Sequence, residues 1–123
     1  MANPNMVNVS SILGATTYLV PTTTTATTWT ALTPSAGTIN KIDTMTATNV
    51  TATSATITVS INSAISGGGT AYRLTYQTSV PGNSSLIVVD KSTGIYVGEG
   101  QSIVVTSGTT NAIEMVGAYE AIT

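Results

Sequence analysis

Apolar and polar residues alternate one by one along much of the chain, and this period of two constrains the fold more than any other feature. In the clearest case, Ile57, Val59 and Ile61 share one face of an extended strand, and hydroxyl side chains share the other. Such a strand has one buried side and one solvated side, as in antiparallel sheets. Windows with helical periodicity are few, so the sequence predicts an all-β protein.

The same pattern recurs at regular intervals. Further strands are expected at residues 17–20, 28–32, 37–50, 70–79, 85–89, 94–97, 102–105 and 113–119. The alternation slips around residues 41–44, which predicts a bulge or a bend there. Turns every 8–12 residues or so are typical of a sandwich or barrel. We expect a single antiparallel β-sandwich, jelly-roll or Ig-like, with seven to nine strands.

Glycine and proline mark the predicted reversals. Three consecutive glycines at residues 67–69 separate two strands, and glycine supplies the positive φ that hairpin turns require. Pro81-Gly82 fits the two central positions of a type II turn. A length of 123 residues suits one domain. We therefore divide the chain into an N-terminal arm at residues 1–11 and a sandwich domain at residues 12–123.

Charge is unusually scarce. Charged residues make up 7% of the chain, against about 25% in ordinary soluble domains, and about one residue in five is threonine. The centres of protein–protein interfaces are depleted in Lys, Glu and Asp. The composition therefore favours a protein whose surface is largely contacted by partners. Thr-rich outer faces also occur in monomeric β domains, which is the alternative.

Several partner classes are not expected from the composition. Lys41, Arg73 and Lys91 are the only cations and are scattered, so no basic patch for nucleic acid is predicted. No apolar run approaches the roughly 18 residues that a membrane helix needs. The first residues lack the basic and apolar segments of a cleaved signal, which predicts synthesis and use in a cytoplasm.

The inventory of reactive groups argues against an enzyme. Histidine and cysteine are absent, and no Ser-x-x-Lys pattern offers a base to a serine nucleophile. Glu114 and Glu120 are expected on one face of the last strand, about 20 Å apart, too far for paired carboxylate catalysis. No calcium-loop or phosphate-loop motif is present. We expect no cofactor and no metal.

We look for contact residues in segments whose sequence gives no reason for them to be buried in the core. These are the arm, with Asn3, Pro4, Asn5 and Val7, and the threonine-rich segment 22–28, with Thr24 and Thr25. The arm could also be frayed.

Aromatic residues supply the remaining candidates. Trp29 is interpreted as an anchor of the core or of an interface, and a ligand platform is the less favoured alternative. Tyr72, Tyr76 and Tyr96 are assigned to the core rim or an interface. Trp29 completes the set of candidate interface residues.

Four stretches carry a resemblance to a known family. They are Met-Ala-Asn-Pro-Asn (1–5), Ser-Leu-Ile-Val-Val-Asp-Lys-Ser-Thr-Gly-Ile-Tyr-Val (85–97), Ser-Ile-Val-Val-Thr-Ser-Gly (102–108) and Ala-Tyr-Glu-Ala-Ile-Thr (118–123). With these the chain resembles a family of small virion structural proteins of tailed phages, notably phages of cyanobacteria and other aquatic bacteria. The resemblance implies a structural role in the virion, after assembly in the host cytoplasm, and carries no active-site residues with it.

Three functions remain open at this stage. The first is a capsid decoration (cement) protein, expected as a homotrimer, whose partners are the major capsid protein or other virion proteins. The second is a tail, neck or fibre component of the same particle. The third, from another class, is a carbohydrate-binding module, because β-sandwiches often host one and the fold alone does not decide function.

Overall fold

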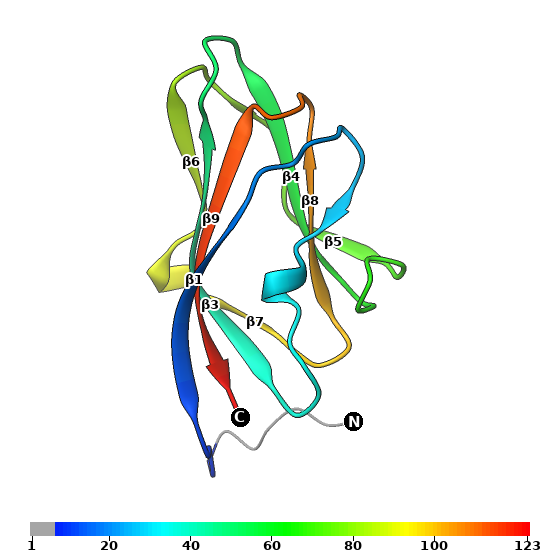
Figure 1. The fold of residues 1–123 in the computed structure, drawn as a ribbon, viewed down its shortest axis with the longest axis vertical. Coiled ribbons are helices and arrows are strands. Elements are labelled where there is room, and N and C mark those ends of the chain that lie inside the picture. Colours follow the sequence, from blue (N-terminus) through cyan, green and yellow to red (C-terminus); the bar gives the residue numbers. More distant parts are fainter. Residues whose placement is uncertain (1–6) are drawn as a thin grey trace.

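The computed structural model describes residues 7–123, which form two antiparallel sheets packed face to face (Figure 1). Sheet A has the strand order β1-β9-β3-β6, with β7 pairing β3 beyond the end of β6, and sheet B has the order β2-β8-β4-β5. The strands are β1 (Ile12–Leu19), β2 (Thr27–Thr28), β3 (Ile39–Asn49), β4 (Ala55–Asn62), β5 (Ala71–Val80), β6 (Ser84–Val89), β7 (Ile95–Val97), β8 (Ser102–Ser107) and β9 (Ile113–Ile122). The predicted all-β sandwich and its strand number are confirmed.

The strand pairs are nested like the two arms of one long hairpin. β1 pairs with β9, β2 with β8, β3 with β6 and β7, and β4 with β5, all antiparallel. Rolling up this hairpin brings β9 beside β3 and β8 beside β4. This is the topology of a jelly roll, one of the two arrangements expected from the sequence.

The core fills the space between the sheets. It is built from the inward-facing residues of alternating strands, such as Ile57 and Val59 of β4 and Ile113 and Met115 of β9, all fully buried. The ring of Trp29 closes the core against β9 at Gly117. A Cβ atom there would lie 3.3 Å from Trp29 Cη2, so glycine lets the ring pack closely on the strand.

Segment 28–32 differs from its predicted strand. Only Thr27–Thr28 is extended, and Thr30–Leu32 forms the 3₁₀ helix η1. A 3₁₀ helix has three residues per turn, so Trp29 and Leu32 point to the same side and both enter the core. The first strand also begins earlier than expected, at Ile12 rather than residue 17.

The irregularity predicted in the long third strand is confirmed. The register between β3 and β9 shifts between Ile42 and Thr44, so Asp43 is the extra residue of a bulge. The bulge lets Ile42 and Met45 both reach the core although they are three residues apart.

The predicted reversals are in place, but one has a different conformation. The glycines at residues 67–69 lie in the loop between β4 and β5, as expected. At Pro81-Gly82, the positive φ belongs to Asn83 (φ 56), so a type II turn with Gly82 at its third position is wrong. Asparagine tolerates this conformation, and Gly82 is needed because a Cβ there would collide with the backbone of Ala52.

Candidate interaction surface

The residues predicted for an interface do not come together. Asn3, Pro4 and Asn5 lie outside the described residues. Val7 is exposed and precedes β1, whereas Thr24 and Thr25 are exposed in the loop that follows β1. Eight extended residues span about 26 Å, so the two groups lie toward opposite ends of the sandwich (Figure 1). At the end of the arm, Ser10 and Ser11 N–H both donate to Thr123 O, at 2.6 and 3.1 Å.

The interface assignment of Trp29 is corrected by its burial. Its side chain is 1% exposed, so the core alternative holds and the ring is available neither to a protein partner nor as a platform for a sugar. The sequence could not separate these alternatives, because a tryptophan among threonines fits any of them. Tyr72, Tyr76 and Tyr96 are exposed instead, and the Arg73 guanidinium lies 5.3 Å from the centre of the Tyr76 ring.

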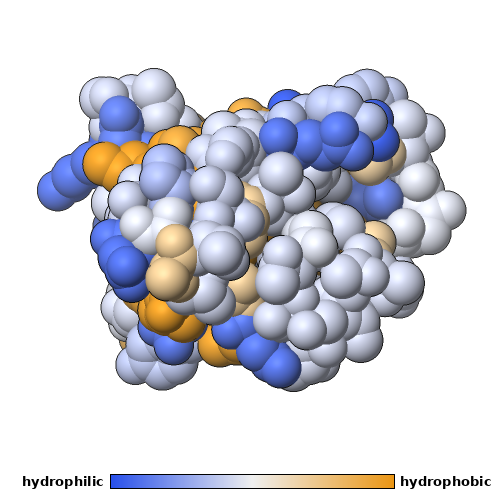
Figure 2. Space-filling model, turned by 90° about the horizontal axis from the view of Figure 1, so that it is seen from above, coloured by the Kyte–Doolittle hydropathy of each residue, from blue (hydrophilic) through white to orange (hydrophobic). Residues whose placement is uncertain are grey.

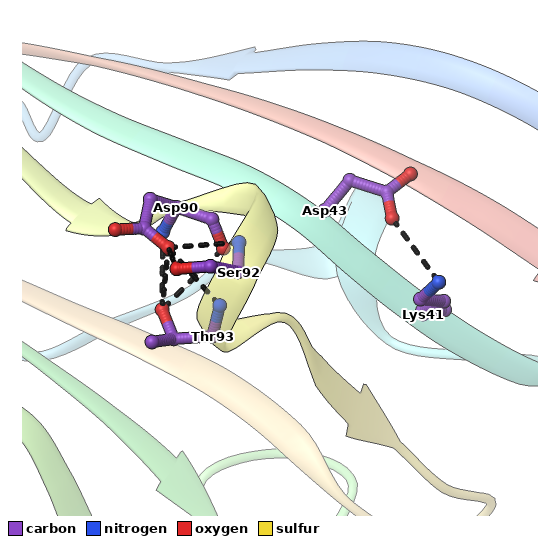
Figure 3. A network of polar contacts seen from close by, with 5 residues as sticks. All are labelled: Lys41, Asp43, Asp90, Ser92 and Thr93. Atoms are coloured by element: carbon purple, nitrogen blue, oxygen red, sulfur yellow. Dashed lines mark hydrogen bonds and ion pairs between the residues drawn. The ribbon is translucent and has the colours of Figure 1, made fainter.

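The ionisable groups serve local structure. Lys41 Nζ lies 3.7 Å from Asp43 Oδ1 across the bulge, as Figure 3 shows. In the same view, Asp90 caps the short 3₁₀ helix η2 (Lys91–Thr93). Its Oδ1 accepts from the backbone N–H groups of Ser92 and Thr93, at 2.9 and 3.0 Å, and from Ser92 Oγ at 2.6 Å. These hydrogen bonds, those of the Ser92 and Thr93 side chains first, lower the pKa of Asp90 below its usual 3.8.

The other carboxylates are dispersed. Glu114 pairs with Thr48 and Glu120 with Lys41, which places both on the outer face of sheet A at separate rows. Glu99 accepts a hydrogen bond of 2.9 Å from the N–H of Gly37, between two loops. Within residues 7–123, no three carboxylates gather to hold a metal ion.

Two shallow clefts share Pro34 in their walls. One, of about 360 Å³, is lined by Pro34, Ala36, Ile65, Glu99 and Gly100. The other, of about 330 Å³, lies among Leu13, Tyr119 and the segment after η1. Their linings are mostly small or apolar, and neither brings together an acid and a base.

Part of the outer face of sheet B, over β2 and β8, is covered by the chain itself. The β4–β5 loop (residues 63–70) folds onto it, and Ser102 Oγ donates to Ala64 O at 2.6 Å. A Cβ atom at Gly67 would lie 3.1 Å from Thr28 Oγ1 and from Val104 Cγ2. Val104 is thereby buried although it points away from the core.

Asn62 holds this loop in place. Its Oδ1 accepts from Ala64 N at 3.0 Å and Gly69 N at 2.9 Å, and its Nδ2 donates to Gly67 O and Gly69 O at 3.2 and 3.3 Å. Asn49 does the same at the other end of β4, where its amide bonds to Thr51, Thr53 and Val80. In a chain so poor in charge, buried amides take the role of fixing loops.

The outer face of sheet A is open and carries an apolar row. The register places Tyr18 opposite Val116, Val116 opposite Thr46, and Thr46 opposite Ile87. These four residues cross the whole sheet from β1 to β6, and we call them the apolar row. Tyr18, Val116 and Ile87 are 73%, 39% and 64% exposed.

The surroundings of the apolar row are uncharged on one side. The next row is Thr16, Ala118 and Thr44, and the row on the other side contains Glu114 beside Thr48 and Ser85. End-on, much of the molecular surface is close to neutral in hydropathy, with a few apolar patches between blue ones (Figure 2). Sequence reasoning missed the apolar row because its members come from four strands and meet only through the strand order.

No family model matches the chain, and no curated protein matches it either. In the part of the chain that the structure describes, every helix is too short to cross a membrane.

Proposed function

We propose that the chain is a structural protein of a tailed-phage virion, a decoration protein that binds neighbouring capsid subunits through the outer face of sheet A. The observation that carries the proposal is the apolar row, whose Tyr18, Val116 and Ile87 are exposed in a chain with 7% charged residues. Jelly rolls are found in viral capsid domains, and they also occur in lectins and cupins, so this support is an analogy of fold.

The energetics suit a contact that is repeated many times. Full burial of a large apolar side chain contributes about 1.5–3 kcal/mol, so covering Tyr18, Val116 and Ile87 from their present exposure contributes on the order of 3 kcal/mol. Neutral hydroxyl neighbours are removed from water at a lower cost than charges would be. A protein that binds only the assembled lattice stabilises that lattice by mass action.

The surface supports the alternative functions to different degrees. A tail, neck or fibre position shares the same surface argument, and immunogold labelling of the particle distinguishes it from the capsid. The carbohydrate-binding alternative has lost its tryptophan platform, because Trp29 is buried. The homotrimer expected from the sequence stays a prediction, and the strand edge described below favours two-fold pairing instead.

Binding to expanded capsids of the encoding phage, prepared without the chain, tests the proposal. We expect the purified protein to co-sediment with these shells, and Ile87→Lys to weaken binding at least tenfold, which is about 1.4 kcal/mol. Ser79→Lys adds the same charge to an exposed position of β5 and is expected to stay within twofold. Absence of wild-type binding refutes the proposed function, and equal binding of both variants refutes the assigned face.

A further inference from the structure

Each sheet of a sandwich has two edge strands, and their unpaired backbone groups can template pairing with another chain. Here the edges of sheet A are β1 on one side and β6 with β7 on the other, and those of sheet B are β2 and β5. Natural proteins protect such edges with short strands, bulges, charges or prolines. Three of these four edges show such protection.

The edges of sheet B are protected in two ways. β2 has only two residues, Thr27 and Thr28. β5 is irregular, because its register with β4 shifts on either side of Val59 and Gln77 has a positive φ of 44°. β5 also carries Arg73, one of the three cations of the chain.

The second edge of sheet A is broken. Met45 pairs with Val89 and Thr46 with Ile87, so Val88 is an extra residue that bulges β6. The helix η2, capped by Asp90 and containing Lys91, then separates β6 from β7. No regular stretch of more than four residues remains on this edge.

The β1 edge has none of these devices. Its eight residues pair with β9 without a register shift, and they include no charged residue and no proline. Six of the eight are exposed, among them Ile12 and Leu13 at 57% and 66%. Among residues 7–123, no strand pairs with its outer side. An uncharged, β-prone strand of this length is the sequence type that pairs with other strands.

We propose that β1 is a docking edge that pairs antiparallel with β1 of a second copy of this chain, which joins the two A sheets into one. The second copy is favoured because β1 is the one edge, among the described residues, that offers an uninterrupted partner of eight residues. Antiparallel self-pairing places a two-fold axis through the contact, so the assembly closes at two chains.

The side chains allow two registers. The outer faces of both copies must lie on the same side of the joined sheet, so the two-fold axis passes at a residue and not between two residues. The residues nearest the middle of β1 are Ala15 and Thr16, and an axis at either gives the longest overlap of the two strands. Centred on Ala15, the pairing sets Tyr18 opposite Ile12 of the second copy. Centred on Thr16, it sets Leu13 opposite Leu19 and Tyr18 opposite Gly14. Like charges face each other in neither register, because β1 has no charge.

The inference is independent of the virion role, because it concerns only the chain with itself. In a dimer the two apolar rows would lie on the same face of the joined sheet but offset along it, because Tyr18 faces Ile12 or Gly14 of the second copy.

Crosslinking tests the edge directly, because the chain has no native cysteine. We expect either Ala15→Cys or Thr16→Cys to give a disulfide-linked dimer under mild oxidation. Ser79→Cys, exposed on β5, is the matched control and is expected to stay uncrosslinked. Equal crosslinking at Ser79, or none at either β1 position, overturns the proposal.

The mass in solution provides the second readout. Light scattering is expected to show a wild-type dimer, and Thr16→Lys, at an exposed position, is expected to raise the dissociation constant at least tenfold by placing like charges across the axis. Circular dichroism checks that this variant is folded. A trimer, or a monomer at every concentration, overturns the proposal. So does a β1 edge that becomes protected from hydrogen exchange only when another virion protein is added.

Discussion

The edge strands β1 and β5 are built from similar residues but differ in backbone regularity and charge. Both are long, at eight and ten residues, and both expose tyrosines. β5 is bulged at two places and carries a cation, whereas β1 is regular and uncharged. Of the three cations, Arg73 lies in β5 and Lys91 beside β6, and Lys41 is paired with Asp43 in the middle of sheet A.

The contrast teaches how a chain with few charges can still control its contacts. Lysine is the usual protection of an edge strand, and this chain has little of it. Backbone irregularity takes over this role at β5 and β6. The absence of any such device at β1 then becomes informative. The variants below probe the Asn62 loop anchor, the β5 bulge and the Asp90 cap in turn.

The largest effect is expected from Asn62→Ala, which releases the β4–β5 loop from sheet B. The variant leaves the N–H groups of Ala64 and Gly69 without their acceptor in a partly buried place. Each buried lost partner costs about 1–3 kcal/mol, and water can reach the exposed N–H of Gly69, so we expect a loss of about 2–4 kcal/mol in the free energy of unfolding. Urea denaturation measures it.

The matched control is Asn8→Ala, at an exposed position before β1, which is expected to stay within about 0.5 kcal/mol. A loss below about 1 kcal/mol would show that the loop is held without the amide.

A smaller effect of opposite sign is expected from Gln77→Gly. Gln77 has a φ of 44°, which costs a residue with a Cβ atom about 1–2 kcal/mol. Glycine relieves this cost and loses about 0.5–1 kcal/mol of chain entropy, so stability should rise by up to about 1 kcal/mol. The hydrogen bond from Gln77 N–H to Thr58 Oγ1, at 2.8 Å, belongs to the backbone and is kept.

Ser79→Gly separates the two contributions. It carries the entropy cost of glycine without relief of a positive φ, and it should lose about 0.5–1 kcal/mol in the same urea titration. Equal destabilisation by both glycine variants would mean that the β5 bulge stores no strain.

Local alternation was enough to predict most of the fold. Ile57, Val59 and Ile61 mark β4 because one face is buried, and the slip of the pattern near Asp43 marks the bulge of β3. Alternation failed in β5, where Tyr72, Leu74 and Tyr76 occupy every second position but do not share one face. The register shifts there break the period of two, and only Leu74 packs against the core.

Local sequence patterns could not predict the candidate site, for a different reason. The apolar row depends on which strands are neighbours, and a jelly roll sets β1 beside β9, about a hundred residues away in sequence. The buried asparagines were also missed, because Asn62 resembles any other polar residue at the end of a strand. Trp29 needed the packing of Gly117 to be assigned to the core.

The smallest effect is expected from Asp90→Asn at the break between β6 and β7. Hydrogen bonds from Ser92 and Thr93 hold the pKa of Asp90 below its usual 3.8, so the charged form stabilises the fold. This contribution is full above that usual value and is lost as the pH falls through the lowered pKa. The melting temperature of Asp90→Asn should therefore lie slightly below that of the wild type at pH 6, with the gap closing in acid.

Between about pH 5 and 8 the gap should stay constant, as expected of a chain without histidine. Ser92→Ala is the companion variant, because it removes the 2.6 Å hydroxyl hydrogen bond to Asp90 and leaves the carboxylate in place. It should narrow the pH dependence without abolishing it, since Thr93 still donates. A gap between wild type and Asp90→Asn that is the same in acid as at pH 6 would mean that the capped helix does not depend on the charge, and that the interruption of this edge is set by the chain geometry at Val88 alone.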